Sequence, residues 1–312
     1  MRVAVIGGGL VGSYVAWQLA EKGHKVTIYE QKIRPGKHAC SGLISERIWG
    51  FIPVNEELVL HKIDASILNV GNNRTKLNFK PQMLVFNRPL LDRYVLGLAL
   101  DAGVRFVIEK IDSLPRNFDY IIGCDGALSI TRRELGLKAP KFRMGILCRV
   151  ESKDKLNPDF VETWPLDKGF AWKIPRGHEV EYGVLAPLEK AKEEFFHFCI
   201  KQNIRPVKQH ASLVPQGLIL SDNPRITLCG DAAGLTKPWS GGGVIWGLSA
   251  AEILVETFPD LNAYNRALKR FFNSKFIVSN FATKLGYLAA KHLPNILPNE
   301  RTMDSDFFPF KF

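Results

Sequence analysis

The chain opens with a short apolar run, a helix-like stretch and a second apolar run. Residues 2–6 are apolar and end in glycines, which predicts a strand buried in a parallel sheet. Residues 12–22 carry apolar side chains on one face at helical spacing, and residues 25–30 read as a second strand. This order predicts a compact βαβ unit at the start of the chain.

The later pattern predicts strands and helices in mixed order, with glycine and proline marking the breaks. A turn at 71–73 separates two predicted strands, 62–70 and 75–80. The other predicted elements are a helix at 44–51, a helix at 89–102, strands at 104–108 and 119–123, several strands across 144–186, a helix at 189–201, strands at 207–214 and 225–229, a helix at 243–256 and a mostly helical stretch at 260–290. The strands across the middle of the chain predict a sheet inserted between two halves of the first domain.

Size and composition are those of a globular protein with a strongly basic balance. The chain has 312 residues, a hydrophobic fraction of 46% and a formal net charge of +11. This size allows two domains, and the charge suits nucleic acid, an anionic membrane surface or a phosphorylated substrate. A basic surface that only keeps the protein soluble is the alternative.

The patterns of cysteine, histidine and apolar residues argue against several classes of protein. The five cysteines are scattered without a C-x-x-C pair, and the histidines show no ligand spacing, so we expect neither a disulfide framework nor a metal site. The chain opens without a secretory signal, and no run approaches about 18 apolar residues. We therefore expect a cytoplasmic protein, either free or peripheral on the membrane.

A glycine fingerprint follows the first predicted strand. Gly7, Gly9 and Gly12 satisfy G-x-G-x-x-G, and Glu30 ends the next predicted strand. In such a pattern the first glycine makes a tight turn, the second lets backbone approach a pyrophosphate, and the third lets helix and strand pack closely. The helix N-terminus attracts the phosphate, while the Glu30 carboxylate can accept hydrogen bonds from a ribose diol. The fingerprint predicts a dinucleotide site and leaves FAD and NAD both open.

Later loops add carboxylates and backbone amides to this predicted site. Two apolar strands each end in a short loop with an aspartate and a glycine, and a glycine run then opens a helix. These residues are Asp125, Gly126, Gly230, Asp231, Gly241, Gly242 and Gly243. A carboxylate at a strand end can reach a ribityl hydroxyl, and the amides of a helix start can face the N1/O2 edge of an isoalloxazine ring. These loops therefore favour FAD over NAD.

The three segments resemble, in order and spacing, the fingerprint, D-G motif and G-D motif of the para-hydroxybenzoate-hydroxylase-like flavoproteins. The resemblance implies non-covalently bound FAD. It also implies that Arg88, just before the predicted helix at 89–102, approaches the FAD. Only one dinucleotide fingerprint is present, so we expect no tightly held nicotinamide cofactor.

Two further segments resemble the geranylgeranyl reductase family within that superfamily. Residues 170–183 are similar to its aromatic-x-Trp-x-hydrophobic-Pro-Lys motif followed by glycine, and residues 36–44 resemble the loop that places a cysteine close to the flavin. The departures are Phe170 for the usual tyrosine, Ile174 for phenylalanine and Arg176 for lysine. The roles implied are catalytic for Cys40, Gly241 and Gly242, and substrate-lining for Phe170, Trp172 and Pro175.

The same residues have plainer interpretations. Phe170 and Trp172 alternate along a predicted strand, where aromatic side chains commonly form core packing. Cys40 taken alone is typical of a small buried side chain. Its position between Gly36 and Gly42 favours a functional role.

The resemblance implies a prenyl reductase that transfers hydride from reduced FAD to an isolated C=C bond of a geranylgeranyl chain. An acid must then protonate the other carbon, and water or Cys40 are the candidates. We expect a prenyl lipid substrate, an external electron donor, contact with an anionic membrane and no nucleic acid. Residues 170–175 also resemble the W-x-W-x-I-P motif of flavin-dependent halogenases. An aromatic monooxygenase or halogenase is therefore one alternative, and an electron-transfer flavoprotein serving a quinone or partner protein is another.

The predicted fold is α/β, with a Rossmann-type FAD-binding domain that is split in sequence, an inserted antiparallel-sheet substrate domain and a C-terminal helical segment. We assign residues 1–60, 84–140 and 216–256 to the FAD-binding domain. The substrate domain is assigned 61–83 and 141–215, and the C-terminal segment is 257–312.

Overall fold

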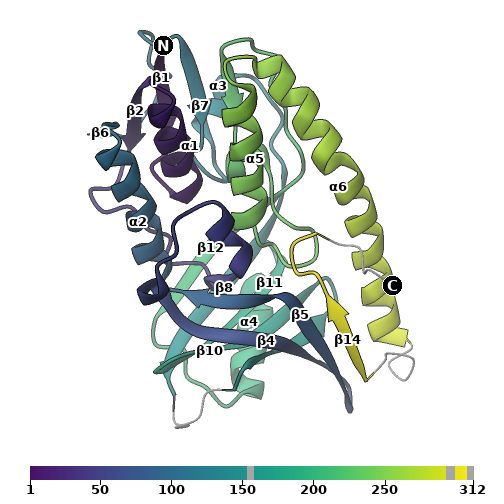
Figure 1. Ribbon diagram of the computed structural model, residues 1–312. Coiled ribbons are helices and arrows are strands. Elements are labelled where there is room, and N and C mark those ends of the chain that lie inside the picture. Colours follow the sequence, from purple (N-terminus) through teal and green to yellow (C-terminus); the bar gives the residue numbers. More distant parts are fainter. Residues whose placement is uncertain (153–157, 293–298, 308–312) are drawn as a thin grey trace.

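Two β-sheets make up the centre of the molecule, with helices around the first sheet and on both faces of the second (Figure 1). The computed structural model describes residues 1–152, 158–292 and 299–307, without the side chains of 284–292. The sheet near the N-terminus is called sheet A and the larger one sheet B.

Sheet A is a five-stranded parallel sheet with the strand order β13-β7-β1-β2-β6. Its strands are β1 (Arg2–Ile6), β2 (Lys25–Glu30), β6 (Arg105–Ile108), β7 (Tyr120–Gly123) and β13 (Ile226–Leu228). β1 lies at the centre, where Val3, Ala4 and Val5 have no exposed surface, as expected of a strand covered on both faces. The predicted Rossmann-type domain, assembled from segments far apart in the sequence, is confirmed.

Three helices pack beside one another on sheet A (Figure 1). They are α1 (Leu10–Glu21), α2 (Arg88–Asp101) and α5 (Val244–Thr257), and α1 contacts both of the others. The Asn87 side chain caps α2 by accepting a hydrogen bond from the Leu90 backbone N–H. The short α3 (Ile130–Glu134) follows β7 and is capped by Ser129.

Among the described residues, sheet B has nine strands, in the order β12-β8-β11-β10-β9-β4-β5-β14, with β3 also paired to β5. The strands are β3 (Leu43–Ser45), β4 (Val59–Val70), β5 (Asn73–Phe86), β8 (Lys141–Glu151), β9 (Phe160–Leu166), β10 (Gly169–Arg176), β11 (Glu179–Pro187), β12 (Gln209–Gln216) and β14 (Glu300–Met303). The sheet was expected to be antiparallel, and most pairs are. The pairs β4–β9 and β5–β14 are parallel, so the sheet is mixed.

Helices α4 (Ala191–Lys201) and α6 (Leu261–His292) complete the described fold. α4 packs on β11 and β8, whereas α6 packs on α5 and then runs down beside sheet B to lie near β14 (Figure 1). The Asp260 side chain accepts a hydrogen bond from the Ala263 N–H at the start of α6. In the part of the chain that the structure describes, no helix is long and apolar enough to cross a membrane.

Two local predictions were wrong. Residues 44–51 were expected to form a helix, but β3 and the short 3₁₀ helix η1 (Glu46–Gly50) cover this region, and a second 3₁₀ helix, η2 (Glu56–Leu58), follows it. Pairing of β3 with β5 outweighs the helical pattern there. The C-terminal segment 257–312 was expected to be a helical segment; α6 confirms the helix predicted over 260–290, but β14, which was not predicted, follows it and adds a strand to sheet B beside β5. These pairings join residues distant in sequence, which a local pattern does not reveal.

Candidate functional site

The glycine fingerprint forms the turn between β1 and α1. Gly7 has a φ of +103°, and a Cβ atom there would lie 2.4 Å from the carbonyl oxygen of Cys124. A Cβ on Gly12 would lie 2.0 Å from the Gly7 oxygen, so α1 can approach the strand only because position 12 is glycine. A Cβ on Gly9 would meet no protein atom within 4 Å. The turn therefore needs Gly7 and Gly12 for packing, whereas Gly9 leaves open the space that a pyrophosphate requires.

Glu30 at the end of β2 is fixed beside this turn. One oxygen of its carboxylate accepts a hydrogen bond from the Gly8 N–H at 2.9 Å, and the other accepts one from the Lys32 N–H at 2.9 Å. Glu30 is half-buried, and its hydrogen bond with Gly8 keeps the carboxylate at the turn that the fingerprint forms. This position suits recognition of a ribose diol.

Asp125, in the D-G motif after β7, has one satisfied and one unsatisfied oxygen. Oδ2 accepts hydrogen bonds from the backbone N–H and the hydroxyl of Thr131, at 2.9 and 3.1 Å. Oδ1 is buried without a hydrogen-bond partner. A buried orphan acceptor is costly, so its presence at a strand end points to a ligand donor.

The D-G and G-D motifs are joined by Arg132 on α3. Its guanidinium donates hydrogen bonds to the backbone oxygens of Ala232, at 2.9 Å, and Ala127, at 2.7 Å. Gly126 has a φ of +77° and Gly230 a φ of +65°, so each loop turns in the left-handed region that favours glycine. The structure thus brings together two motifs that are about a hundred residues apart in sequence.

The glycine run at 241–243 leads directly into α5. A Cβ on Gly243 would lie 2.9 Å from Oδ1 of Asp231, and one on Gly242 would lie 2.8 Å from the Lys237 side chain. The run therefore packs closely against the G-D motif, and its amides lie at the N-terminal end of α5. Such an end stabilises negative charge on a bound group.

The loop of residues 36–42 folds back onto the G-D motif. The Lys37 ammonium contacts Oδ2 of Asp231 at 2.9 Å, and the Asp231 carboxylate raises the pKa of Lys37. The Lys37 backbone N–H donates to the Asp92 carboxylate on α2 at 2.9 Å. Two acidic groups from different elements therefore hold this loop beside the predicted cofactor site.

Cys40 of the same loop contacts Arg88. Nη1 of Arg88 lies 3.2 Å from the Cys40 sulfur, and Nη2 lies 2.8 Å from the Asp92 carboxylate. Burial alone would lower the pKa of Arg88, but the charge of Asp92 and the contacts with Asp92 and Cys40 outweigh it and raise the pKa. The guanidinium is thus a permanent buried cation next to the thiol.

A second buried group of charges ties the Cys40 loop to sheet B. Glu181, on β11, has no exposed surface and contacts Arg149 at 3.1 Å and Arg176 at 3.6 Å. These two arginines donate to backbone oxygens of the loop: Arg149 to Cys40 at 3.1 Å, and Arg176 to Ser41. We call Arg149, Arg176 and Glu181 the loop clamp. It fixes the Cys40 backbone to the sheet that carries the predicted substrate residues.

A cavity of about 410 Å³ lies between sheet B, α6 and the loop that precedes α5. Its lining is mainly apolar, with a few hydroxyls and one lysine. The lining residues are Ser41, Leu43, Ser66, Leu68, Leu77, Phe79, Met83, Val161, Thr163, Pro165, Phe170, Trp172, Ile174, Lys237, Trp239, Ser240, Gly242, Ser279, Ala282, Thr283, Met303 and Ser305. Because Ser41 and Gly242 both line it, the cavity reaches the Cys40 loop and the glycine run.

The predicted substrate residues fall on both faces of β10. Phe170 and Trp172 line the cavity, with ring centroids 5.6 Å apart. The Trp172 indole donates to the Glu181 carboxylate at 3.0 Å, so it is held by the loop clamp. Pro175 was expected to line the pocket, but it is not among the lining residues. Side chains alternate along a strand, so its neighbour Ile174 faces the cavity instead.

The C-terminal residues close one side of the cavity. Met303 and Ser305 line it, and Asp306 is fixed by the Lys237 ammonium at 3.1 Å and the Ser45 hydroxyl at 2.5 Å. Burial alone would raise the pKa of Asp306, but Lys237 and the hydrogen bonds outweigh it and lower the pKa. The segment after α6 is therefore part of the cavity wall.

Sequence reasoning missed several residues of the site. Two of them could have been found from the sequence. Lys37 is the only lysine or arginine in the Cys40 loop (residues 36–42), and Asp92 lies four residues after Arg88, a spacing at which opposite charges pair on a helix. Glu181 could not have been found in this way, because in the sequence it is an ordinary polar residue of an alternating strand. Its contacts with the two arginines exist only in the folded structure. Within the described residues, no group of three metal-ligating side chains is found.

The residues of this site fit FAD. The open space at Gly9 and the orphan oxygen of Asp125 are features that a bound dinucleotide would fill and satisfy. Glu30 would hold the adenosine ribose, and Asp231 with the glycine run would hold the ribityl and flavin parts. Cys40, in contact with Arg88, directly precedes Ser41, which lines the cavity, so this loop would lie between the cavity and a bound flavin.

Comparison with known proteins agrees with this geometry. Residues 2–117 match the family described as FAD dependent oxidoreductase. A digeranylgeranylglycerophospholipid reductase from Methanosphaera stadtmanae is 26% identical over 319 residues, which covers 86% of this chain and 79% of that protein.

Solved structures share the fold over nearly the whole chain. A geranylgeranyl bacteriochlorophyll reductase-like protein from Thermoplasma acidophilum matches with a TM-score of 0.84 and 18% identity, covering 98% of this chain and 93% of that one. A flavin-dependent brominase matches with a TM-score of 0.77 and 13% identity, covering 95% and 91%. The family model and the sequence relative support the prediction from the motifs that this chain is an FAD-dependent oxidoreductase similar to the geranylgeranyl reductases, and the solved structure shows that it shares their fold.

Proposed function

We propose that this protein uses reduced FAD to saturate C=C bonds in the geranylgeranyl or similar polyprenyl chain of a lipid. The observation that carries the proposal is the apolar cavity that leads from the Cys40 loop into sheet B. Bound FAD supplies the hydride chemistry, and the chain supplies binding, orientation and protons. The sequence relative named as a digeranylgeranylglycerophospholipid reductase supports the same substrate class.

The cavity suits a long apolar chain more than a compact aromatic substrate. Its lining follows β5 from Met83, near the Cys40 loop, to Leu77. Met83 pairs with Ile63 and Leu77 pairs with Ser66 on β4, three residues further along, so the two positions lie roughly 10 Å apart along the sheet. An elongated apolar space that starts at the cofactor would let successive double bonds of one chain be brought to the same point.

Cys40 is proposed as the proton source for the second carbon. The hydride goes to one alkene carbon, and the thiol proton goes to the other, which leaves a thiolate. Arg88, 3.2 Å from the sulfur, would stabilise that thiolate because its own charge is held permanently by Asp92. Water would then return a proton to the sulfur before the next reduction.

The experiment that tests the reductase proposal is an anaerobic incubation of the chemically reduced protein with a geranylgeranyl lipid, followed by mass analysis. We expect products that gain hydrogen in pairs. A monooxygenase or halogenase would instead oxidise NAD(P)H only with oxygen and add hydroxyl or halide to an aromatic compound. That alternative rests on fold likeness to enzymes such as the brominase and on residues 170–175. An electron-transfer flavoprotein would give neither product.

We also propose peripheral contact with an anionic membrane and an external electron donor. A prenyl lipid resides in a bilayer, and the net charge of +11 would draw the protein to an anionic surface. The donor must reach the flavin from outside, since a single dinucleotide fingerprint leaves no second site for a tightly bound nicotinamide.

A further inference from the structure

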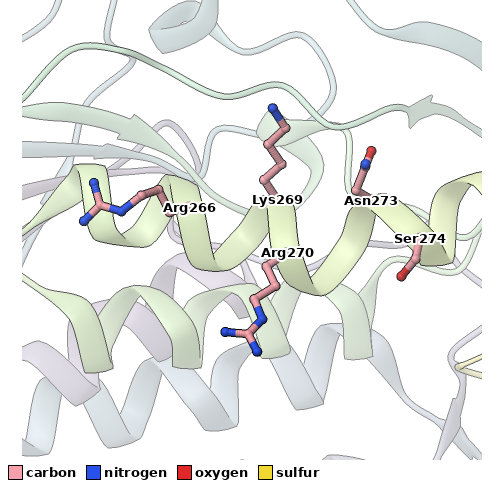
Figure 2. A pocket seen from close by; sticks show the side chains of 5 residues that line it. All are labelled: Arg266, Lys269, Arg270, Asn273 and Ser274. Atoms are coloured by element: carbon pink, nitrogen blue, oxygen red, sulfur yellow. The ribbon is translucent and has the colours of Figure 1, made fainter.

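Helix α6 is the most one-sidedly charged element of the chain. Its 32 residues contain six lysines and arginines and no aspartate or glutamate, so the helix alone contributes +6 (6 − 0) of the net charge of +11. Three of these cations, Arg266, Lys269 and Arg270, are exposed on its first half. Figure 2 shows them projecting from the helix around a shallow hollow.

The second half of the same helix exposes apolar side chains. Ile277 is 64% exposed, Phe281 is 65% exposed, and Val278 is 41% exposed. At about 100° per residue, Ile277 and Phe281 project in the same direction as Arg266 and Arg270. The outer face of α6 is therefore basic in its first part and apolar in its second part.

The inner face of α6 lines the cavity. Phe272 and Phe276 are buried against Trp246, and the inner positions after them are the smaller Ser279, Ala282 and Thr283. This change from large to small side chains leaves the space in which the cavity lies. The Ser279 hydroxyl is buried without a hydrogen-bond partner, as expected where a wall faces a ligand space. The exposed apolar residues thus lie outside the wall whose inside is the cavity.

We infer that the outer face of α6 is the surface by which the protein docks on a bilayer of anionic phospholipids. Its cations would meet lipid phosphates, while Ile277 and Phe281 would enter the boundary between headgroups and acyl chains. Docking there would put the cavity wall against the membrane that holds the substrate. This inference rests on the proposed function for its purpose, but the docking itself requires no turnover.

A second copy of the chain is a poorer occupant of this face. A two-fold dimer would place the same patch on both partners, so the cations would face either like charge or the apolar half of the partner's helix, and neither offers them an anion. α4 offers a useful comparison, because Phe196 and Ile200 are also exposed on it. There the neighbouring Glu193 and Glu194 are acidic, so α4 lacks the one-sided charge that attracts an anionic surface.

Vesicle co-sedimentation of the full chain tests the inference. Vesicles of phosphatidylcholine with phosphatidylglycerol are compared with vesicles of phosphatidylcholine alone. We expect binding only to the anionic vesicles, and weaker binding in about 1 M salt, where the Debye length falls to about 3 Å. Arg266→Gln/Lys269→Gln/Arg270→Gln and Ile277→Ser/Phe281→Ser should each weaken partitioning about tenfold or more.

Matched variants on α4 serve as controls. Phe196→Ser/Ile200→Ser removes a similar exposed apolar area. Lys190→Gln/Lys192→Gln/Lys201→Gln removes three positive charges, as many as the triple variant on α6. Both variants should bind vesicles as the unmodified chain does. FAD content and melting temperature confirm folding of every variant. The inference is overturned if the α4 variants lose binding as much, if no vesicle is bound, or if Ile277→Ser/Phe281→Ser converts a dimer to a monomer in sedimentation velocity. Reduction of detergent-dispersed geranylgeraniol without vesicles reports separately on the proposed function.

Discussion

Cys40 owes its chemical setting to two neighbours rather than to its own loop. Arg88 lies against its sulfur, and the loop clamp holds its backbone through Arg149. When a thiol donates its proton, a neighbouring guanidinium stabilises the thiolate that remains. The contact with Arg88 therefore favours proton donation by Cys40. A cysteine that served only packing would need no buried cation beside it.

Substitution of Cys40 by serine should therefore affect turnover more than folding. The hydroxyl keeps the shape but is a far weaker acid, so we expect the reductive rate to fall about tenfold or more, equivalent to at least about 1.4 kcal/mol of barrier. FAD affinity and melting temperature should barely change. Cys199→Ser, in a buried position between α4 and sheet B, is the control and should leave the rate intact. Unchanged turnover of Cys40→Ser with a clear loss of stability would show that Cys40 is a packing residue.

The loop clamp predicts a different pattern for Glu181→Gln. Removing this carboxylate leaves Arg149 and Arg176 without their shared buried anion, which should cost about 3 kcal/mol of unfolding free energy. Because the clamp positions the Cys40 loop, alkylation of Cys40 by iodoacetamide should also become faster, as followed by mass spectrometry. A stability loss with unaltered alkylation would contradict the positioning role. Glu162→Gln, whose ion pair with Lys173 is partly exposed, should cost about 1 kcal/mol or less and leave alkylation unchanged.

Among the elements, those with a strong local signal were predictable from the sequence and those set by distant pairing were not. The first βαβ unit and the glycine motifs carry their reasons locally, since a turn or a close helix needs glycine at that position. β3 and β14 exist because β5 offers them an edge, and their own residues do not reveal it. The same limit explains why Pro175 was placed in the cavity and Glu181 was overlooked. A strand's facing and a carboxylate's partners depend on the neighbouring strands.

At the turn between β1 and α1, two glycine substitutions can distinguish the packing of the turn from its binding of FAD. In Gly12→Ala the new Cβ would press on the Gly7 oxygen, so we expect lower stability without FAD and weak FAD binding. In Gly9→Ala the new Cβ would meet no protein atom, so the FAD-free melting temperature should stay within about a degree or two while FAD affinity falls. Thermal melts without FAD and titrations with FAD measure the two effects. Equal FAD affinity of Gly9→Ala and the unmodified chain would argue against a pyrophosphate at this turn.

At the scale of the whole molecule, the two sheets have different roles. Sheet A and its loops form the cofactor site, and sheet B with α6 and β14 encloses the cavity. The Cys40 loop lies where they meet, since it contacts Asp231 on one side and the loop clamp on the other. Under the reductase proposal, a prenyl chain in the cavity would extend from this junction along sheet B.

The length of the cavity gives the last prediction. Leu77 lines the cavity on β5, outside the Cys40 loop, so Leu77→Trp should shorten the space along β5 without touching that loop. Reduction of geranylgeraniol should fall about tenfold or more, because the filled end excludes several carbons that are each worth about 0.8 kcal/mol of burial. Geraniol, which is half as long, should be reduced as before.

Leu100→Trp, at a position partly exposed on α2, controls for the added indole and should change neither rate. Competition between the two alcohols in one reaction, followed by mass analysis, measures the ratio directly. If both rates of Leu77→Trp fall together, the substitution acts on the fold. If neither changes, the chain does not run along β5 and the path proposed for the substrate is wrong. A fall confined to the long substrate would show that the cavity sets how far a prenyl chain can be drawn past the flavin.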